Sequence, residues 1–222
     1  MKARTAFLVL LTAGVVGSAA WLVFFSPVLG VRSIEIVGNL TVPSEQIEQQ
    51  AGVADLHPLA TVNLADVQTR VLGIRRLATA KVDRIWPGTL KIEVVEREPV
   101  AAFPVGDKVA IVDERGVVIE LRAAAPPMLP LLQIDRPVEG DPAMMAALQV
   151  IKAVPAEVAG KVRRVRAGTA EGVTLELSDG RTVIWGGVDR PQEKAQILTS
   201  LLKRERAVTL YDVSSPDVVT LK

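Results

Sequence analysis

The chain has 222 residues, with 26 lysines and arginines against 25 aspartates and glutamates and a formal net charge of +1. This balance excludes a whole-protein field that attracts nucleic acid, while 49% hydrophobic and 23% charged residues are typical of a globular chain. The absence of cysteine excludes disulfides, a cysteine nucleophile and thiolate zinc sites. The single histidine, His57, cannot form a multi-histidine metal site, and we interpret it as an ordinary loop residue.

An uncharged, largely apolar segment runs from Thr5 to Phe25. About 20 apolar residues at roughly 1.5 Å each span a hydrocarbon core of roughly 30 Å. Backbone groups in lipid must be paired within the segment, so it should be helical, and Ser26-Pro27 should end it. We predict a transmembrane helix over residues 6–25, preceded by a tail of residues 1–5.

Charge beside this segment predicts its orientation. Lys2, Arg4 and the amino group precede it, whereas the next charge after it, Arg32, is soon balanced by Glu35. Positive charge favours the cytoplasmic side of a membrane. We therefore expect residues 1–5 in the cytoplasm and the bulk of the chain outside it, as in a single-pass type II membrane protein.

A cleaved signal peptide is the alternative, because Ser18-Ala19-Ala20 resembles a cleavage site. The apolar run continues beyond these residues through Trp21 to Phe25. Signal-peptide cores are usually only about 7 to 15 residues long, so the length favours an anchor.

The next 70 residues predict a small sheet with two helices on one face. Val31 to Asn39 alternates apolar and polar residues and reads as a half-buried strand. We expect a first helix with Thr41 as N-cap and Gly52 as its end, and a second helix that starts at Asn63. The apolar positions of the second helix, Leu64, Val67, Val71 and Ile74, fall on one face.

A hairpin completes this first unit. Residues 81–86 and 89–96 are expected strands, and Pro87-Gly88 is a tight-turn dipeptide between them. In the return strand, Leu90, Ile92 and Val94 lie on the face expected to be buried. Residues 97–104 read as a junction, and beyond it we expect strands at 109–112 and 117–120 and a helix capped by Asp141. A hairpin of 173–177 and 181–185 should follow, and then a helix behind a capping box of Asp189 and Gln192. The last expected elements are extended segments at 208–213 and 218–222.

Three motifs in order along the chain carry a resemblance to a known family. They are the strand Val31 to Asn39, the segment Val82 to Ala101 with its Trp-Pro turn and Glu-Arg-Glu-Pro-Val-Ala ending, and Val112 to Val118, which reads Val-Asp-Glu-Arg-Gly-Val-Val. Together with the short tail and single span, the ordered set resembles the FtsQ/DivIB family of bacterial cell-division proteins over essentially the whole chain.

The resemblance implies an α+β fold, with one transmembrane helix followed by a POTRA-like domain at residues 28–98 and a mixed β domain at residues 99–222. It implies a non-enzymatic scaffold in the cell membrane at the division septum, without cofactors. Such a scaffold links early and late division proteins, binds FtsB and FtsL, and contacts FtsW and FtsI, which helps control septal peptidoglycan synthesis.

In the family, the last strand of the β domain is an open edge onto which FtsB adds a strand. An exposed edge has unpaired backbone groups that can template another strand. Ser214 and Ser215 stand where many relatives have arginine and an aromatic residue, so the resemblance supports backbone pairing here more than side-chain anchors. The matching positions are Asp212, Val213, Ser214, Ser215, Val218, Val219, Thr220 and Leu221.

Other polar and aromatic groups have ordinary interpretations. We read Glu93, Glu96 and Glu98 as solvated or surface-paired and not catalytic. The basic run Lys161 to Arg166 reads as a solvated strand face with its two valines packed inward, with anionic lipid or septal glycan as the alternative contact. The cluster Lys203 to Arg206 suits a helix C-terminus.

Trp86 and Trp185 are expected in the core, and exposure of either would indicate a partner surface. Two alternatives from other classes are weighed. A membrane-tethered envelope enzyme would need a polar catalytic cluster, and the sequence has no Gly-rich phosphate loop, Ser/His/Asp set or metal cluster. An envelope assembly or transport factor would usually carry several POTRA repeats or a barrel, and the sequence shows no internal repeat.

Overall fold

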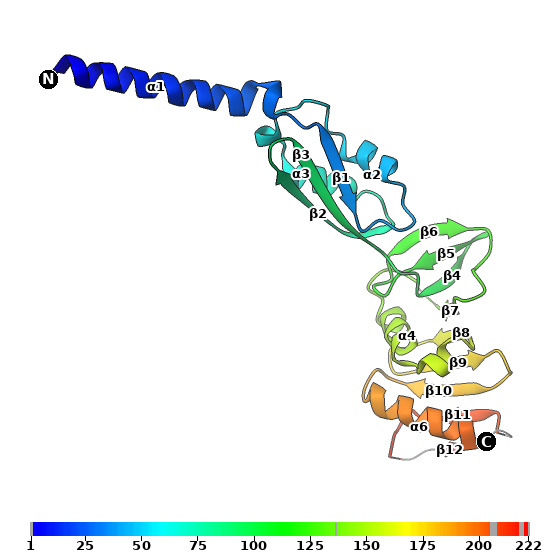
Figure 1. The fold of residues 1–222 in the computed structure, drawn as a ribbon. Helices are drawn as coiled ribbons and strands as arrows, with labels where there is room; N and C mark the ends of the chain where they lie inside the picture. The colour runs from blue at the N-terminus through cyan, green and yellow to red at the C-terminus, as the bar shows by residue number, and fades with distance from the viewer. Residues whose placement is uncertain (1, 136, 205–207, 218–219, 222) are drawn as a thin grey trace. The chain divides into compact units, whose positions relative to one another are not determined.

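The computed structural model describes residues 2–135, 137–204, 208–217 and 220–221 (Figure 1). The chain divides into two compact units, Met1–Arg97 and Glu98–Lys222. Both units contain helices together with mainly antiparallel strands, so the predicted α+β class is confirmed.

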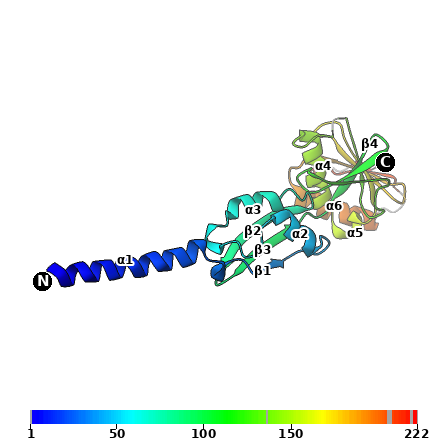
Figure 2. The ribbon, with the colours of Figure 1, turned by 90° about the horizontal axis from the view of Figure 1, so that it is seen from above.

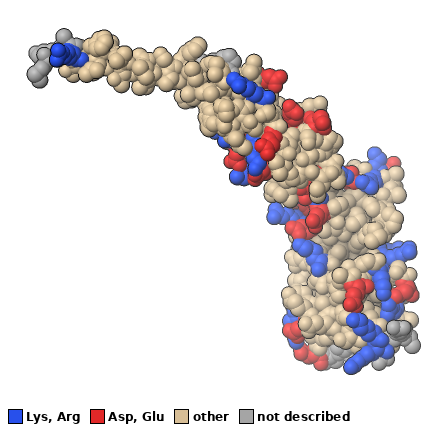
Figure 3. Space-filling model, viewed as in Figure 1, with Lys and Arg blue, Asp and Glu red and all other residues tan. Residues whose placement is uncertain are grey.

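The first helix, α1, spans Lys2–Phe25 and contains a 21-residue stretch, Arg4–Phe24, that is long and apolar enough to cross a bilayer. Apart from basic side chains at its start, Figure 3 shows it as a rod of uncharged side chains, and its large apolar residues are exposed to the surroundings. A short 3-10 turn, η1 (Pro27–Leu29), follows it into the rest of the first unit (Figures 1 and 2). The helix therefore indicates a single-pass membrane anchor, with the bulk of the chain on one side.

The first unit contains a three-stranded sheet of β1 (Ser33–Val37), β2 (Leu77–Ile85) and β3 (Thr89–Glu96), in the order β1-β3-β2. β1 runs parallel to β3, and β2 forms the predicted antiparallel hairpin with it. The helices α2 (Ser44–Ala51) and α3 (Leu64–Val71) pack on the sheet face formed by alternate residues of β3, with η2 (Leu59–Thr61) between them. The buried residues of this core include Ile47, Leu59, Val67, Val71, Leu77, Val82, Leu90, Ile92 and Val94.

The predicted ends of helices α2 and α3 are confirmed, except for the start of α2. Asn63 caps α3 by accepting a hydrogen bond from the Asp66 amide, and Gly52 ends α2 with a left-handed φ of 58°. The predicted N-cap at Thr41 is wrong, because α2 begins at Ser44 and no side-chain cap is formed at Pro43. The Thr41 hydroxyl instead donates to a carboxylate from β3, which is described below.

The second unit is built on a nine-stranded sheet in the order β12-β11-β10-β9-β8-β7-β4-β5-β6. Its strands are β4 (Ala101–Val105), β5 (Lys108–Val112), β6 (Val118–Arg122), β7 (Leu131–Ile134), β8 (Val162–Ala167), β9 (Val173–Leu177), β10 (Thr182–Gly186), β11 (Leu210–Asp212) and β12 (Thr220–Leu221). The predicted hairpin corresponds to β9 and β10, which pair in antiparallel fashion.

Three helices accompany this sheet: α4 (Pro142–Ala153), α5 (Ala156–Ala159) and α6 (Pro191–Arg204). Asp141 caps α4 as predicted by accepting from the Met144 amide. The helices share one core with the central strands, and its buried residues include Met144, Leu148, Val165, Leu175, Trp185, Leu198 and Tyr211.

The capping box predicted at Asp189 is replaced by another contact. Helix α6 begins at Pro191, so Asp189 lies two residues before it. Its Oδ1 accepts a hydrogen bond from Lys194 Nζ at 2.9 Å, and the Lys194 side chain is fully buried. No sequence pattern indicates this ion pair, because a lysine in an amphipathic helix normally lies in solvent.

Candidate partner-binding site

The terminal strands form one end of the nine-stranded sheet. β11 pairs in parallel with β10, with Tyr211 opposite Val183, and β12 pairs antiparallel to β11, with Thr220 opposite Asp212. β12 is the outermost strand at this end of the sheet. Among the described residues, no strand pairs with its outer side, so its outward backbone groups can template another strand.

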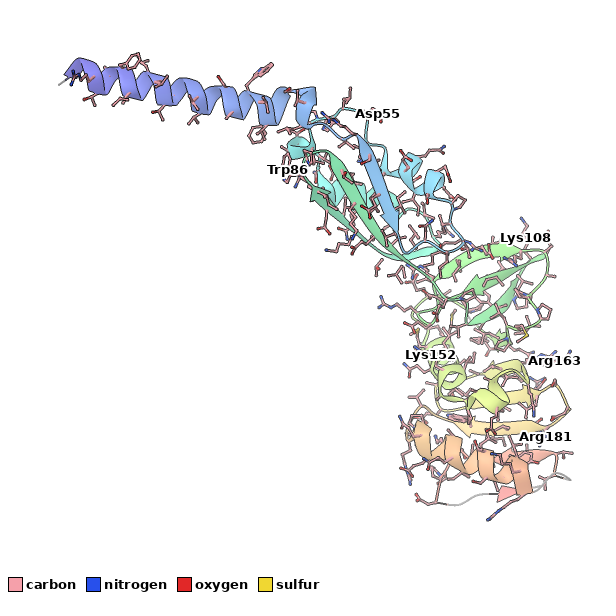
Figure 4. All side chains as sticks on the ribbon, in the orientation of Figure 1. Asp55, Trp86, Lys108, Lys152, Arg163 and Arg181 are labelled. Carbon is pink, nitrogen blue, oxygen red and sulfur yellow. The ribbon has the colours of Figure 1, made fainter. Side chains whose placement is uncertain are left out.

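β11 is held firmly beneath this edge. The Tyr211 side chain is fully buried, and the Arg181 guanidinium lies 5.8 Å from the centre of its ring (Figure 4 labels Arg181). The Val213 amide donates to the Ile184 carbonyl at 2.9 Å, which extends the connection to β10 beyond the end of β11. Hydrogen bonds to Asp179 and to Tyr211 raise the pKa of Arg181, so it remains charged.

The turn after β11 is fixed by a local carboxylate. Ser214 donates to Asp212 Oδ1 from both its amide and its hydroxyl, at 3.0 and 2.7 Å. The chain passes so close to β10 that a Cβ added to Gly186, whose φ is +76°, would lie 2.8 Å from Ser214 Cβ. Ser214 therefore shapes the turn that leads to the edge, which is a role the sequence did not indicate.

An ion-pair network ties this turn to the start of α6. Arg190 donates to both carboxylate oxygens of Asp217, at 2.8 and 3.2 Å, and also to Glu193. Its hydrogen bonds hold the pKa of Asp217 below its ordinary value. The network links the segment before β12 to the helix that precedes β11.

The structure brings the predicted site residues together only in part. Asp212 and Ser214 meet in the turn, Val213 is buried, and Ser215 is exposed. Thr220 and Leu221 form β12, whereas Val218 and Val219 lie outside the described residues. The feature that can receive a partner is therefore the backbone of β12, with the earlier residues as its support.

The basic run lies on β8 in the arrangement that the sequence predicts. Val162 and Val165 are buried, and Arg164 and Arg166 both pair with Glu176 on β9 at 2.7 and 2.9 Å. Figure 4 labels Arg163, the exposed residue at the bulge of this strand. Glu176 offsets one of the four positive charges of this run, and its pairs with the partly exposed Arg164 and Arg166 are those of a solvated strand face.

Two expectations about single residues in the first unit are wrong. Trp185 is fully buried as predicted, but Trp86 is 51% exposed at the β2–β3 turn. Glu93 forms the expected surface pair with Lys91, at 2.5 Å, whereas Glu96 is not an ordinary surface carboxylate.

Glu96 binds the whole segment between β1 and α2. Its Oε1 accepts from the amides of Leu40, Thr41 and Val42 at 2.7, 2.8 and 2.9 Å, and its Oε2 accepts from the Thr41 hydroxyl. Burial of the carboxyl opposes ionisation, but these four hydrogen bonds together outweigh it and lower the pKa of Glu96 to about 2. The pattern is that of a structural anion site, so it gives no support to catalysis.

Comparison with known proteins adds independent evidence. A family profile described as POTRA domain, FtsQ-type, matches residues 29–97, and one described as Cell division protein FtsQ/DivIB, C-terminal, matches residues 101–218. Curated relatives named Cell division protein FtsQ are 44% identical over 201 residues in Mycolicibacterium smegmatis and 40% identical over 222 residues in Mycobacterium tuberculosis. A further relative in Streptomyces venezuelae is 32% identical over 218 residues.

These matches cover 90%, 100% and 93% of this chain, respectively. The chain spans 60% of the length of the Mycolicibacterium relative, 69% of the Mycobacterium relative and 80% of the Streptomyces relative.

Proposed function

Because the chain belongs to the FtsQ/DivIB family of cell-division proteins, we propose that it is a membrane-anchored division scaffold whose terminal sheet edge receives a strand from a partner protein. The family works as a non-enzymatic scaffold within the division machinery, and this implies protein partners. In the proposal, α1 is the anchor, residues 28–98 form the POTRA-like domain and residues 99–222 form the β domain.

The proposed partners are FtsB and FtsL at the terminal edge and the septal synthase machinery of FtsW and FtsI. By holding these proteins together at the septum, the scaffold links early to late division proteins and helps control septal peptidoglycan synthesis. The proposed orientation is type II, with residues 1–5 in the cytoplasm, because Lys2 and Arg4 precede the apolar helix.

The position of β12 as the outermost strand is the observation that supports strand addition most directly. Main-chain hydrogen bonds supply affinity in this binding mode, and alternate side chains supply specificity. The proposed contact segment comprises the described residues Asp212, Val213, Ser214, Ser215, Thr220 and Leu221, together with Val218 and Val219.

Proline substitutions in β12 test the backbone contact. In an antiparallel pair the N–H groups of successive residues point to opposite sides, so one of Thr220 and Leu221 faces β11 and the other faces outward. Proline at the outward-facing position removes a donor to the partner, and proline at the other position breaks the pairing of β12 with β11. Thr220→Pro and Leu221→Pro should each weaken binding of the FtsB/FtsL complex by about 2- to 13-fold, since one net hydrogen bond contributes roughly 0.5–1.5 kcal/mol. Val219→Pro, which lies outside the described residues, should also weaken binding without unfolding the domain.

The measurement is a titration of the FtsB/FtsL complex onto the full chain in nanodiscs. Thr220→Val is the matched control, because it keeps the backbone N–H and should bind almost as the original chain does. Unchanged affinity in all three proline variants would refute strand addition at this edge.

Placement at the septum is tested separately in cells. A fluorescent fusion at the amino terminus should give a band at midcell, and depletion of the protein should give filaments or failed septa. A uniform membrane signal with normal division after depletion would contradict the scaffold function, whatever the titration shows.

A further inference from the structure

The end of the apolar helix is tied closely to two loops of the first unit. The Val31 amide donates to the His57 carbonyl at 2.8 Å, and the Leu56 amide donates back to the Val31 carbonyl at 2.8 Å. The Arg32 amide donates to the Gly88 carbonyl at 2.8 Å. The loops around residues 56–58 and 86–88 therefore flank the chain where it leaves α1.

The segment between α1 and β1 packs closely against both loops. A Cβ added to Gly30 would lie 2.4 Å from the Leu56 carbonyl oxygen, and one added to Gly88 would lie 2.9 Å from the Gly30 carbonyl oxygen. The intervening η1 turn, Pro27–Leu29, is a 3-10 segment with a rise of only about 2 Å per residue. Both loops therefore lie near the C-terminal end of α1.

Large apolar side chains project from this junction into the surroundings. Val28 and Leu56 are each 53% exposed, Trp86 is 51% exposed and Ile85 is 42% exposed. Figure 4 labels Trp86, and also Asp55 beside Leu56, at the end of the unit that α1 joins. Single exposed apolar residues are common, but four on adjoining segments form a patch of the kind that marks an interaction surface.

The backbone holds one of these side chains outward. Leu56 has a φ of +60°, a conformation that glycine and asparagine adopt far more readily than leucine. The paired hydrogen bonds between Val31 and the Leu56–His57 segment hold this conformation, and the Leu56 side chain is left half exposed.

We propose that Val28, Leu56, Ile85 and Trp86, together with the neighbouring Arg32, form a membrane rim that rests in the headgroup region of the leaflet from which α1 emerges. Tryptophan favours this region because its ring is apolar and its N–H is polar. Arg32 suits it as well, since its guanidinium donates to the Val28 carbonyl at 2.7 Å while its stem lies along Gly88.

The bilayer is the occupant that the structure favours, because Val28 follows the apolar helix directly and hydrogen bonds of Val31 and Arg32 hold the loops of the other rim residues beside this segment. This contact fixes the height and tilt of the first unit above the membrane, so the unit does not swing freely about the anchor. The inference goes beyond the proposed function, since it involves neither β12 nor a protein partner.

The absence of natural cysteine allows a direct test with single spin labels. Nitroxides are attached to Leu56→Cys and Trp86→Cys in the full chain, in nanodiscs of phosphatidylcholine and phosphatidylglycerol at 3:1. Power saturation then compares oxygen, which concentrates in lipid, with a nickel chelate, which stays in water. Labels at both positions should be accessible to oxygen and shielded from nickel.

Leu40→Cys is the matched control, because Leu40 is 88% exposed and lies past the opposite end of β1, roughly 17 Å away along a five-residue strand. Val16→Cys on α1 reports whether the helix lies in lipid. Aqueous profiles at positions 56 and 86 like that at position 40 would overturn the proposal and leave the rim free for a protein partner. An aqueous profile at position 16 would overturn it as well, since the chain would then have no anchor in the bilayer.

Discussion

Replacing Glu96 with glutamine should destabilise the first unit far more than the same change at Glu93. The glutamine keeps one acceptor oxygen but loses the charge that the Leu40, Thr41 and Val42 amides stabilise. The fall in pKa from 4.5 to about 2 corresponds to roughly 3.4 kcal/mol at about 1.36 kcal/mol per unit. Partial exposure of the side chain screens this interaction, so we expect a loss of about 1–3 kcal/mol.

Hydrogen exchange of the three amides at pH 6.5 measures the effect where it arises. A loss of about 1–3 kcal/mol should reduce their protection by roughly 5- to 150-fold in Glu96→Gln. Glu93→Gln is the matched control on the same strand, because, within the described residues, Glu93 forms a single ion pair, with the partly exposed Lys91, and binds no backbone amide of the Leu40–Val42 segment. It should change stability by less than about 0.5 kcal/mol. Equal protection in the two variants would refute the anion-site interpretation.

The pH dependence gives a second test with a defined sign. The folded pKa of Glu96 lies below its ordinary value, so its stabilisation is complete above about pH 5 and is lost as the pH falls toward 2. More than half of it should be lost by pH 3. The stability difference between the original chain and Glu96→Gln should therefore shrink between pH 6 and pH 3, as measured by thermal unfolding.

Two further predictions concern the support of the terminal edge, both measured by urea unfolding of the second unit. Gly186→Ala should lower the free energy of unfolding by at least about 1 kcal/mol more than Gly180→Ala does. Both glycines have positive φ, but only at Gly186 would a new Cβ lie within contact distance of Ser214. Equal losses in the two variants would contradict this close approach. Asp189→Ala should lower the free energy of unfolding by about 1–3 kcal/mol, since it leaves the buried Lys194 ammonium without its carboxylate. Lys194→Met should lower it less, because Asp189 is 64% exposed and water can solvate it. The reverse order would show that the ion pair does not govern this site.

The elements that the sequence predicts correctly depend on neighbours in the chain. The hairpin of β2 and β3 follows from the Pro87-Gly88 turn and from the alternation of Leu90, Ile92 and Val94 in the return strand. The caps at Asn63 and Asp141 each act on an amide three residues later. Such signals lie within a single window of sequence, so pattern and turn chemistry are sufficient to find them.

The features that the sequence does not reveal depend on residues far apart in the chain. Thr41 reads as a helix cap, but its hydroxyl binds Glu96, 55 residues later. Lys194 reads as a solvated helix residue, but the loop before α6 buries it. Trp86 reads as a core residue, and only the path of the chain out of α1 places it at an exposed junction. The candidate edge itself was predicted from a family resemblance, since no local pattern identifies which strand is outermost.

Charge distinguishes the terminal edge from the other strand edges of the described structure. The two sheets have four edge strands, β1, β2, β6 and β12. β1 carries Glu35, β2 carries the Lys81–Asp83 pair, and β6 carries the Arg122–Glu120 pair. Charged side chains on an edge oppose unwanted pairing, whereas the sequence from Val218 to Leu221 contains no charge. Three edges thus carry charges that oppose strand addition within the strand itself, whereas β12 carries none, which is the arrangement expected if this edge receives a partner.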